Sequence, residues 1–469
     1  MTRSSPSTKE SDAVSAVTYP DQTRFALRDG VTCVATASGA VLLNPPDNRK
    51  LTGLTESQLQ ALKQLGQGSA TLGEQTGEDA GALMSELADA GWLTVTIRDG
   101  GREQYTIRPF TRPPARPRTP LPASWVLSKF AVLHRDRDGF LLEHPMSWCD
   151  LRIHDPRLLA ALDGPGAAET GVAQDVLDRL AQDLYWGGFL VDDAAAEDRE
   201  FSTRSWSAPD LWFHRRSTLG PRTITWEHFG PTKWGKGSFP QPPARKPAYP
   251  GAPVALAKPD LESLRIEDPS LTDVLEDRVS CRDYDDAAPM TVDQLGELLY
   301  RTARTRSVRQ VAEGEELVSR PYPSGGSVYE LELYPIVRNV AGLKPGMYHY
   351  DSFEHALRPV ADADSPAVRK LVRSTSATLT DGAEPQLVLL LAARSGRVMW
   401  TYEQVAYASI LKHVGVLMQT LYLAATAMGL GACAQGFSDT GAFVTAAGVD
   451  ELEECSVGSV IVGTPARKR

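Results

Sequence analysis

The sequence predicts an α+β protein built from several domains. Its 469 residues exceed the length that one hydrophobic core usually organises. Residues 256–469 alternate short apolar runs with helical segments, which predicts a central sheet covered by helices. The part before residue 200 runs twice through strand pairs followed by helices, which indicates a degenerate internal repeat.

These patterns divide the chain into five parts. We expect a disordered tail over residues 1–20, two winged-helix-like domains over 21–112 and 113–197, an aromatic and proline-rich linker over 198–255, and a large domain over 256–469. The tail is rich in Ser and Thr and has no apolar core, so it is not a secretion signal.

The first winged-helix-like domain is predicted from strands and one clear helix start. Two strand-like runs flank Asp29-Gly30, a turn pair typical of β-hairpins. Thr55 and Gln58 have the spacing of a capping box, which opens a helix. A second hairpin is expected around the turn Asp99-Gly100-Gly101.

The second winged-helix-like domain repeats this order. Strands flank an Asp138-Gly139 turn, and helices are expected near residues 156–162 and 172–184. Both domains place acidic residues on the helices that would face DNA, and the net charge of the chain is -10. Because phosphate repels such surfaces, a nucleic-acid partner is disfavoured and a peptide added to an exposed edge strand is the better expectation.

The linker and the large domain differ in composition. The aromatic residues of 198–255 are expected to cover apolar surface of the neighbouring domains. In the large domain we expect strands at 329–337, 386–392 and 456–462, and a long helix over 406–428. Residues 414–432 carry no charge but contain polar side chains, which favours a buried core or interface helix over a membrane span.

The cysteines indicate neither a disulfide framework nor a metal site. There are five, they are scattered, and none forms a C-x-x-C pair. We therefore expect free thiols in a reducing cytoplasm and no bound metal.

Three segments of the large domain have the composition of a ligand site. Arg278, Ser280 and Arg282 place two guanidiniums and a hydroxyl within one extended turn, which suits a phosphate and the polar edge of a ring. The turn Pro323-Ser324-Gly325-Gly326 allows close approach of the backbone to a ligand. A glycine-punctuated turn over 429–436 contains Gln435. No G-x-G-x-x-G follows a strand, so a Rossmann dinucleotide site is not expected.

At these residues the chain resembles the FMN-dependent nitroreductase fold, and within it the SagB-like azoline dehydrogenases of ribosomal peptide natural-product biosynthesis. The matching motifs are Arg278-x-Ser-x-Arg282, Pro323-Ser-Gly-Gly326 and Gln419-x-x-x-Leu-Ala-Ala-Thr-Ala-Met-Gly-Leu-Gly431. The two domains in front resemble the leader-peptide recognition modules of cyanobactin-type oxidases.

The resemblance implies a cytoplasmic homodimer with one FMN at each subunit interface and no membrane or nucleic-acid partner. It implies a precursor peptide, with leader and core, as substrate, and a cyclodehydratase as a partner enzyme. The residues implied to bind FMN are Arg278 and Arg467 at the phosphate, Ser280 and Arg282 at the ribityl chain and the N1/O2 edge, Pro323, Ser324, Gly325 and Gly326 from the partner subunit, and Gln435 and Gly436 near N5.

One departure from the family pattern concerns catalysis. Family members commonly carry a Lys-Tyr pair where this chain has Thr401-Tyr402, and an arginine is replaced by Ala408. Oxidation of an azoline removes a proton as well as a hydride, so a base must face the substrate. Tyr402 is then the candidate base beside Thr401, and Tyr407 or His413 could help.

The expected function is FMN-dependent oxidation of azoline rings to thiazoles or oxazoles in a ribosomally made peptide. Two alternatives stay open at this point. One is another FMN-dependent two-electron oxidation or reduction on a precursor peptide, and the other is a catalytically inactive peptide-binding scaffold of a synthetase complex.

Overall fold

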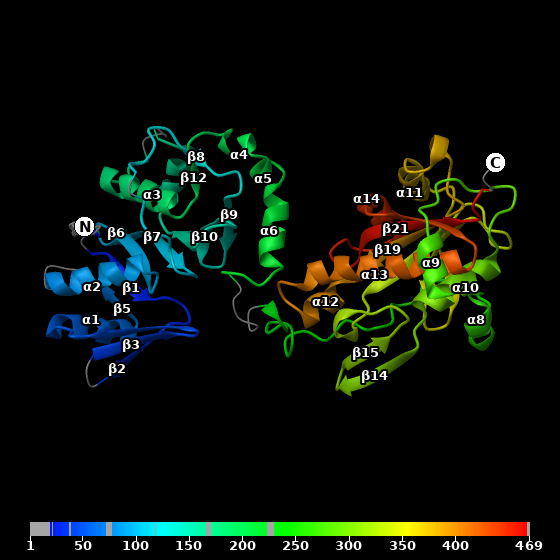
Figure 1. Ribbon diagram of the computed structural model, residues 1–469, viewed down its shortest axis with the longest axis horizontal. Coiled ribbons are helices and arrows are strands. Elements are labelled where there is room, and N and C mark those ends of the chain that lie inside the picture. Colours follow the sequence, from blue (N-terminus) through cyan, green and yellow to red (C-terminus); the bar gives the residue numbers. More distant parts are fainter. Residues whose placement is uncertain are drawn as a thin grey trace, which may run out of the picture. The chain divides into compact units, whose positions relative to one another are not determined.

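The computed structural model divides the chain into two compact units, one before and one after the bond between residues 224 and 225. It describes residues 19–20, 22–36, 39–71, 77–117, 119–165, 170–222 and 229–466. Each unit has its own hydrophobic core, so we describe them separately (Figure 1).

The N-terminal unit is built on one antiparallel sheet of seven strands. Their order across the sheet is β5 (Ser69–Thr71), β1 (Arg24–Leu27), β6 (Leu93–Asp99), β7 (Arg102–Pro109), β11 (Cys149–Ile153), β10 (Gly139–Glu143) and β9 (Val132–Asp136).

Smaller elements complete this unit. Strands β2 (Thr32–Thr36), β3 (Gly39–Asn44) and β4 (Asp47–Thr52) form a separate meander, and β8 (Val126–Leu127) pairs with β12 (Leu190–Val191). The helices are α1 (Glu56–Gln67), α2 (Glu78–Asp89), η1 (Pro156–Asp163), α3 (Gln174–Trp186), α4 (Ala196–Arg199), α5 (Phe201–Arg204) and α6 (Ala208–Arg216). The capping box predicted at Thr55 begins α1, because the side chains of Thr55 and Gln58 bond each other's backbone N–H groups.

The element order agrees with the predicted repeat. Strands β2, β3 and β4 precede α1 and α2, and strands β9, β10 and β11 precede η1 and α3 in the same way. The pairing of β1 with β6 corresponds to the pairing of β8 with β12. The assignment of each repeat to a winged-helix class stays a prediction.

The two repeats are not separate domains. Strand β7 of the first pairs with β11 of the second over five residue pairs, from Tyr105–Ile153 to Pro109–Cys149, and one core cluster runs through both. The predicted boundary between residues 112 and 113 therefore divides a single sheet. The hairpin predicted at Asp29-Gly30 is also wrong, because β1 lies between β5 and β6 and does not pair with β2.

A buried polar network joins the repeats as well. Asp183 of α3, whose side chain is fully buried, accepts hydrogen bonds from the Tyr105 hydroxyl (2.8 Å) and from Arg179 Nε (2.9 Å). Arg116, in the connecting segment, pairs with Asp183 at 3.4 Å and lies over the ring of Trp186 at 3.8 Å. A buried carboxylate needs such partners, so the network fixes α3 against β7.

His144 makes the stability of this unit dependent on pH. It is buried, and its Nδ1 accepts the N–H of Met146 at 3.1 Å, while Nε2 lies 3.0 Å from Ser128 Oγ. Burial, with a smaller contribution from the Arg222 guanidinium, lowers the pKa of His144 from 6.5 to about 4. Between these two values the unfolded chain binds a proton that the folded unit does not.

We expect the contribution of His144 to the free energy of unfolding of the N-terminal unit to be constant above pH 6.5. As the pH drops from 6.5 to 4, this free energy should fall by about 3 kcal/mol. Urea unfolding followed at a series of pH values measures it. The variant His144→Gln should lose the part of the pH dependence that lies in this interval, and an unchanged dependence would contradict the assignment.

The C-terminal unit is built on a second antiparallel sheet of seven strands. Their order is β13 (Val254–Ala255), β18 (Ala356–Asp362), β17 (Gly346–Asp351), β16 (Leu331–Val337), β19 (Leu387–Ala393), β21 (Cys455–Gly463) and β20 (Gly431–Gln435). The strands predicted at 329–337, 386–392 and 456–462 correspond to β16, β19 and β21.

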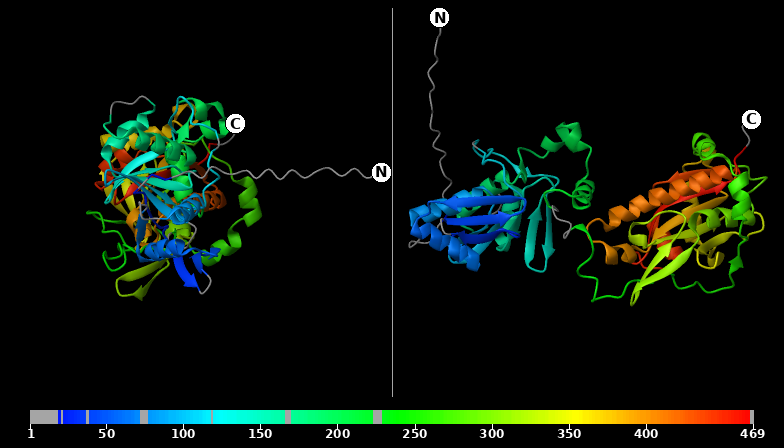
Figure 2. Two further views of the ribbon diagram at one scale, coloured as in Figure 1. Left: turned by 90° about the vertical axis from the view of Figure 1, so that its left-hand side faces the viewer. Right: turned by 60° about the horizontal axis from the view of Figure 1, so that its bottom comes forward.

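Helices cover both faces of this sheet (Figure 1). They are α8 (Leu261–Glu267), α9 (Leu271–Asp277), α10 (Val292–Ala303), α11 (Pro366–Ser376), α12 (Ser395–Thr401), α13 (Ala406–Ala427) and α14 (Thr440–Ala447), with η2 (Gly325–Ser327) and η3 (Thr380–Gly382) as short 3₁₀ turns. A hairpin of β14 (Ser307–Ala312) and β15 (Glu315–Ser319) stands away from the sheet (Figure 2).

Side chains alternate between the two faces, as the geometry of a strand requires. Leu387, Leu389 and Leu391 of β19 pack in the core that contains α10 and α13, and Val388 and Leu390 pack in the core that contains α11 and α14. Every residue of β16 and β19 is buried.

Helix α13 is, within the described ranges, the one helix long and apolar enough to cross a membrane, with a mean hydropathy of 1.2. Its buried residues include Ile410, Leu417 and Leu421, which pack in the core beneath the sheet. Tyr407 and Leu411 on its outer side remain 40% exposed. The helix therefore lies on the sheet and leaves an apolar side uncovered.

The predicted linker does not form a separate segment. Helix α6 belongs to the N-terminal unit, where Trp212 is buried and donates its indole N–H to the carbonyl of Phe130 at 3.2 Å. Ala244 and Lys246 belong to the C-terminal unit, where Lys246 bonds the Tyr334 hydroxyl at 2.9 Å. Trp226 and His228 of the aromatic run lie outside the described residues.

Candidate functional site

The predicted turn Pro323-Ser324-Gly325-Gly326 lies just before β16 and has an unusual backbone. Gly326, Ser327 and Tyr329 all adopt positive φ, at 61°, 54° and 47°. For residues with a side chain this conformation costs about 1 kcal/mol or more, and it persists only where the surroundings hold it. The outer side of the turn is exposed at Pro323, Gly325 and Gly326.

His413 of α13 holds the turn from its inner side. Its Nε2 accepts the N–H of Gly325 at 2.8 Å, and its Nδ1 lies 2.7 Å from Oε1 of Glu330. Glu330 is fully buried and directly follows the last strained residue of the turn. One imidazole therefore bonds both ends of the segment from Gly325 to Glu330.

Tyr402 packs on the same turn. It follows α12, and its backbone N–H donates to the carbonyl of Val398 at 2.7 Å. A Cβ atom placed on Gly326 would lie 2.8 Å from the Tyr402 hydroxyl, and one on Gly325 would lie 3.2 Å from His413 Nε2. The two glycines are thus needed for contact with Tyr402 and His413, which the sequence alone did not reveal.

Thr401 has a structural role in this arrangement. Its hydroxyl donates to the carbonyl of Arg397 at 3.1 Å within α12, and its carbonyl accepts the N–H of Thr232 at 3.1 Å. The structure therefore brings Tyr402 and His413 to the glycine turn, while the hydroxyl of Thr401 closes the helix.

Arg397 is a further residue of this region that the sequence did not indicate. It is fully buried, and its Nε donates to the carbonyl of Val328, in the middle of the turn, at 2.8 Å. Burial, together with the nearby Arg394, lowers the pKa of Arg397 to about 10. The sequence signal that could have revealed Arg397 is a charged residue inside an apolar segment, and the same signal was present at Glu330.

The Arg278 segment forms a second group of residues near the other end of α13. Ser280 pairs with Ala432 of β20 in a backbone bridge, and its Oγ lies 3.0 Å from the hydroxyl of Tyr422. The Arg278 guanidinium lies over the Tyr422 ring at 5.2 Å. Arg282 is exposed, and the one described hydrogen bond of its side chain goes to the carbonyl of Ser280, at 3.4 Å.

This group is positively charged and open. Neither Arg278 nor Arg282 forms an ion pair with a carboxylate in the part of the chain that the structure describes. Unpaired guanidiniums beside a hydroxyl suit an anion such as phosphate. Arg467, predicted to join them, lies outside the described residues.

The two groups are not adjacent in one chain. His413 and Tyr422 lie nine residues apart on α13, which corresponds to roughly 14 Å along the helix axis. One end of α13 thus carries the glycine turn with Tyr402, and the other carries the arginines.

Gln435 and Gly436 differ in what they can offer. The Gln435 amide is buried and fully bonded, donating to Thr375 and Thr378 and accepting from Ser459 Oγ at 2.8 Å. Its side chain therefore fixes β20 to α11. Gly436 is exposed, and a Cβ placed there would meet nothing within 4 Å, so its backbone can be approached.

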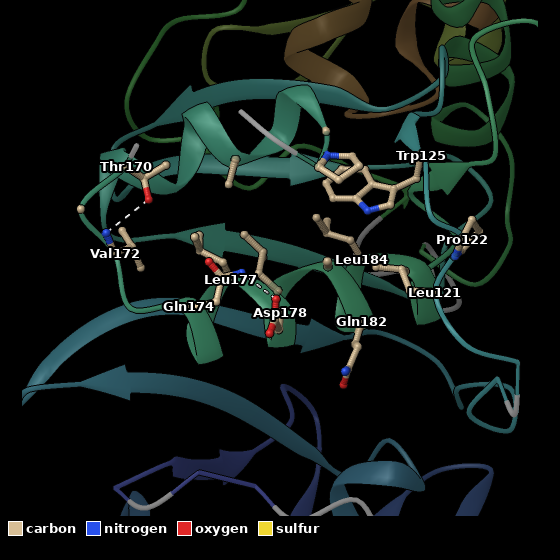
Figure 3. A pocket seen from close by; sticks show the side chains of 16 residues that line it. Leu121, Pro122, Trp125, Thr170, Val172, Gln174, Leu177, Asp178, Gln182 and Leu184 are labelled. Atoms are coloured by element: carbon tan, nitrogen blue, oxygen red, sulfur yellow. Dashed lines mark hydrogen bonds between the residues drawn. The ribbon is translucent and has the colours of Figure 1, made fainter. Parts of the chain in front are cut away.

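A pocket of about 1000 Å³ lies in the N-terminal unit (Figure 3). Trp125, Leu121 and Leu184 line one end, and Thr170 and Gln174 line the other. Its one acidic side chain, Asp178, accepts a hydrogen bond from Gln174 at 2.8 Å. The pocket lacks the clustered titratable groups of a reaction centre, and no cluster of metal-ligating side chains occurs anywhere in the described ranges.

An antiparallel sheet covered by helices on both faces defines an α+β domain. Residues 275–464 match the family model described as Nitroreductase family, and residues 125–223 match the one described as Cyanobactin oxidase ThcOx. The C-terminal unit thus contains a nitroreductase domain, and the protein is an oxidoreductase. The predicted resemblance is thereby confirmed.

Named relatives agree with this assignment. The Methanocaldococcus jannaschii protein MJ1384, named as a nitroreductase, is 28% identical over 186 residues, which are 40% of this chain and 85% of that protein. The trifolitoxin-processing protein TfxB of Rhizobium leguminosarum bv. trifolii is 30% identical over 28% of this chain and 36% of its own length. The microcin B17-processing protein McbC of Escherichia coli is 30% identical over 24% of this chain and 42% of its own.

A solved nitroreductase from Ralstonia eutropha aligns with 51% of this chain and 99% of its own, at 24% identity and a TM-score of 0.36.

Replacement of Gly326 by Ala should lower the free energy of unfolding of the C-terminal unit by roughly 1–3 kcal/mol. The added methyl group is strained at φ 61° and meets the Tyr402 hydroxyl. In a Tyr402→Phe background the cost should be smaller, since the hydroxyl is gone. Gly436→Ala is the matched control and should change the value by no more than about 0.5 kcal/mol. Equal effects at the two glycines would contradict the described packing.

Proposed function

We propose that the protein is an FMN-dependent dehydrogenase that oxidises azoline rings to thiazoles or oxazoles in a ribosomally made peptide. The observation that carries the proposal is that Arg278 and Arg282, beside Ser280, form no ion pair with a described carboxylate in a domain that matches the nitroreductase family. The names of TfxB and McbC, which process trifolitoxin and microcin B17, support a peptide substrate.

The residues present fit FMN. A phosphate offers only acceptor oxygens at its anionic face, and Arg278, Arg282 and Ser280 offer donors that no described carboxylate neutralises. We assign the phosphate to Arg278 and Arg467, and the ribityl chain and the N1/O2 edge to Ser280 and Arg282. When bound, FMN supplies the acceptor for a hydride.

The chain's own residues must then take the proton that leaves the ring with the hydride. Thr401 stands where the family carries lysine, and its hydroxyl is already bonded within α12. The Tyr402 hydroxyl lies against Gly326 of the turn and has no hydrogen bond among the described residues, so we assign Tyr402 as the catalytic residue. A neutral phenol is a weak base, so neighbouring groups must assist Tyr402 in taking the proton.

A homodimer explains why the site lies in two parts. The arginines and the glycine turn lie at different ends of α13, roughly 14 Å apart. The side of α13 that carries Tyr407 and Leu411 is apolar and 40% exposed at both residues. We propose that a second copy covers this side and brings its Ser324 turn and Tyr402 to the Arg278 group of the first.

The N-terminal unit is assigned to peptide recognition. Its second repeat falls in the part that matches the cyanobactin oxidase model, and strands β9 and β5 are the open edges of its sheet. An extended peptide can add to such an edge. Azolines arise by cyclodehydration of Cys, Ser or Thr residues, so a cyclodehydratase must supply the substrate, and the five free cysteines suit a reducing cytoplasm.

Purified protein should show flavin absorption and release FMN on denaturation. Arg278→Ala should weaken FMN binding at least tenfold, since a charge-assisted contact to phosphate is lost. Fluorescence titration with FMN measures the change, and Arg309→Ala on the exposed strand β14 is the control. A colourless wild-type protein that takes up no FMN would instead favour a peptide-binding scaffold.

Separation of the units at residues 223–228 tests peptide recognition. The C-terminal unit should keep FMN and lose most of its affinity for a precursor peptide that the full chain binds, measured by titration calorimetry. Removal of residues up to 122 is a poorer test, because it deletes β7, the partner of β11. Retained affinity in the isolated C-terminal unit would remove the recognition role from the N-terminal unit.

A further inference from the structure

We infer that His413, oriented by Glu330, is the positioning residue of this site: it closes the strained turn from Gly325 to Tyr329 against α13 and so sets the place of Tyr402. The inference rests on the proposed function for its catalytic meaning. The closure of the turn by the imidazole stands on geometry alone.

The hydrogen bonds define which tautomer the ring adopts. The N–H of Gly325 can only donate, so His413 Nε2 must accept and carries no proton. The ring proton therefore resides on Nδ1 and donates to Glu330 Oε1 at 2.7 Å. A ring with both nitrogens protonated would set two N–H groups against each other at Gly325, so the closed turn requires a neutral His413.

The turn needs such a closure because its backbone is strained. Three of its residues hold positive φ, and two of these, Ser327 and Tyr329, carry side chains. Other contacts hold its middle: Arg397 Nε bonds the carbonyl of Val328 at 2.8 Å, and the N–H of Tyr329 donates to Ser324 Oγ at 3.2 Å. The imidazole differs from these contacts because it bonds Gly325, the first residue of the segment, and Glu330, the residue after its end.

Glu330 is costly to bury for structure alone. Its side chain is fully buried, and Oε2 has no hydrogen-bond partner among the described residues. An apolar residue would be the cheaper occupant of such a place if packing were its only role. A carboxylate here instead selects the tautomer that leaves Nε2 free to accept.

The charged and titratable groups around the pair come from three elements. Arg397 of α12 and Tyr402, which directly follows α12, face the turn. Arg320 and Tyr322 precede the turn, and Lys412 is exposed on α13 beside His413. The Tyr322 hydroxyl is buried near Glu330 and interacts with the Arg320 guanidinium. None of these groups replaces the imidazole at Gly325, whose N–H is bonded to Nε2.

Amide hydrogen exchange, read by mass spectrometry on the full chain, tests the closure directly and needs no bound cofactor. In His413→Leu, exchange in peptides that cover residues 321–330 should become about tenfold faster, the effect of one lost hydrogen bond to a buried group. Peptides from β19 and β21 should not change. His413→Gln keeps an acceptor near the place of Nε2 and should restore part of the protection, and Lys412→Ala is the control beside it.

Measurement of kcat then shows whether His413 only closes the turn or also positions Tyr402 for catalysis. With azoline peptide as substrate and saturating FMN, His413→Leu should lower kcat at least tenfold, and saturation keeps any weaker contact between the turn and FMN out of the comparison. Glu330→Gln keeps the shape and an acceptor for Nδ1, so it should fold even where His413→Leu does not, and it should show the same loss in smaller measure.

The outcomes are distinct. Unchanged exchange at residues 321–330 in both His413→Leu and Glu330→Gln overturns the inference. Faster exchange with unchanged kcat overturns the positioning role. A wild-type protein without FMN or turnover overturns the proposed function, and the exchange result still decides the closure.

Discussion

The C-terminal unit depends on burial of three neighbouring strands on both faces. All residues of β16 and β19 are buried, and nearly all of β21, so the hydrophobic effect demands cover above and below the sheet. Helix α13 supplies most of it on one face, and α11 and α14 supply it on the other. Since α13 must lie along the sheet, its two ends are fixed in space, and each end carries one group of functional residues.

The buried carboxylates Glu330 and Glu332 of this unit are each paired with a histidine. Burial alone would raise the pKa of Glu332, but a hydrogen bond from His349 at 3.0 Å and the nearby guanidiniums of Arg320 and Arg394 lower it to about 2. Such clusters add little net stability compared with apolar packing, but a lost partner is expensive. They therefore define one arrangement of the segment between β15 and β16, which is the segment that carries the glycine turn.

Local sequence patterns predicted helices and strands well where apolar residues recur over a long segment. The long helix expected over 406–428 is α13, and the apolar strand expected at 386–392 is β19 shifted by one residue. Pairing between distant segments was not predictable, because β7 and β11 carry no local signal that they will meet. The Asp29-Gly30 turn failed for the same reason: Trp92 provides the carbonyl that bonds the N–H of Arg28, where a hairpin partner was expected.

The site was predicted in part. The Arg278 segment and the glycine turn were found because their residue types are distinctive, but the reason for the glycines was not, since contact with Tyr402 and His413 is a tertiary property. Glu330 was missed because it lies in an alternating apolar run that reads as a strand. Gln435 was assigned to the cofactor, and the structure instead uses its amide to fix β20 to α11.

The shared sheet of the N-terminal unit has a consequence for solubility. Two separate repeats would expose four strand edges, whereas the fused sheet has two, β5 and β9. Exposed edges invite pairing between molecules. Strand β5 is only three residues long, and β9 ends in the charged residues Arg135 and Asp136. Fusion has thus left one edge too short to template aggregation and the other protected by charged side chains.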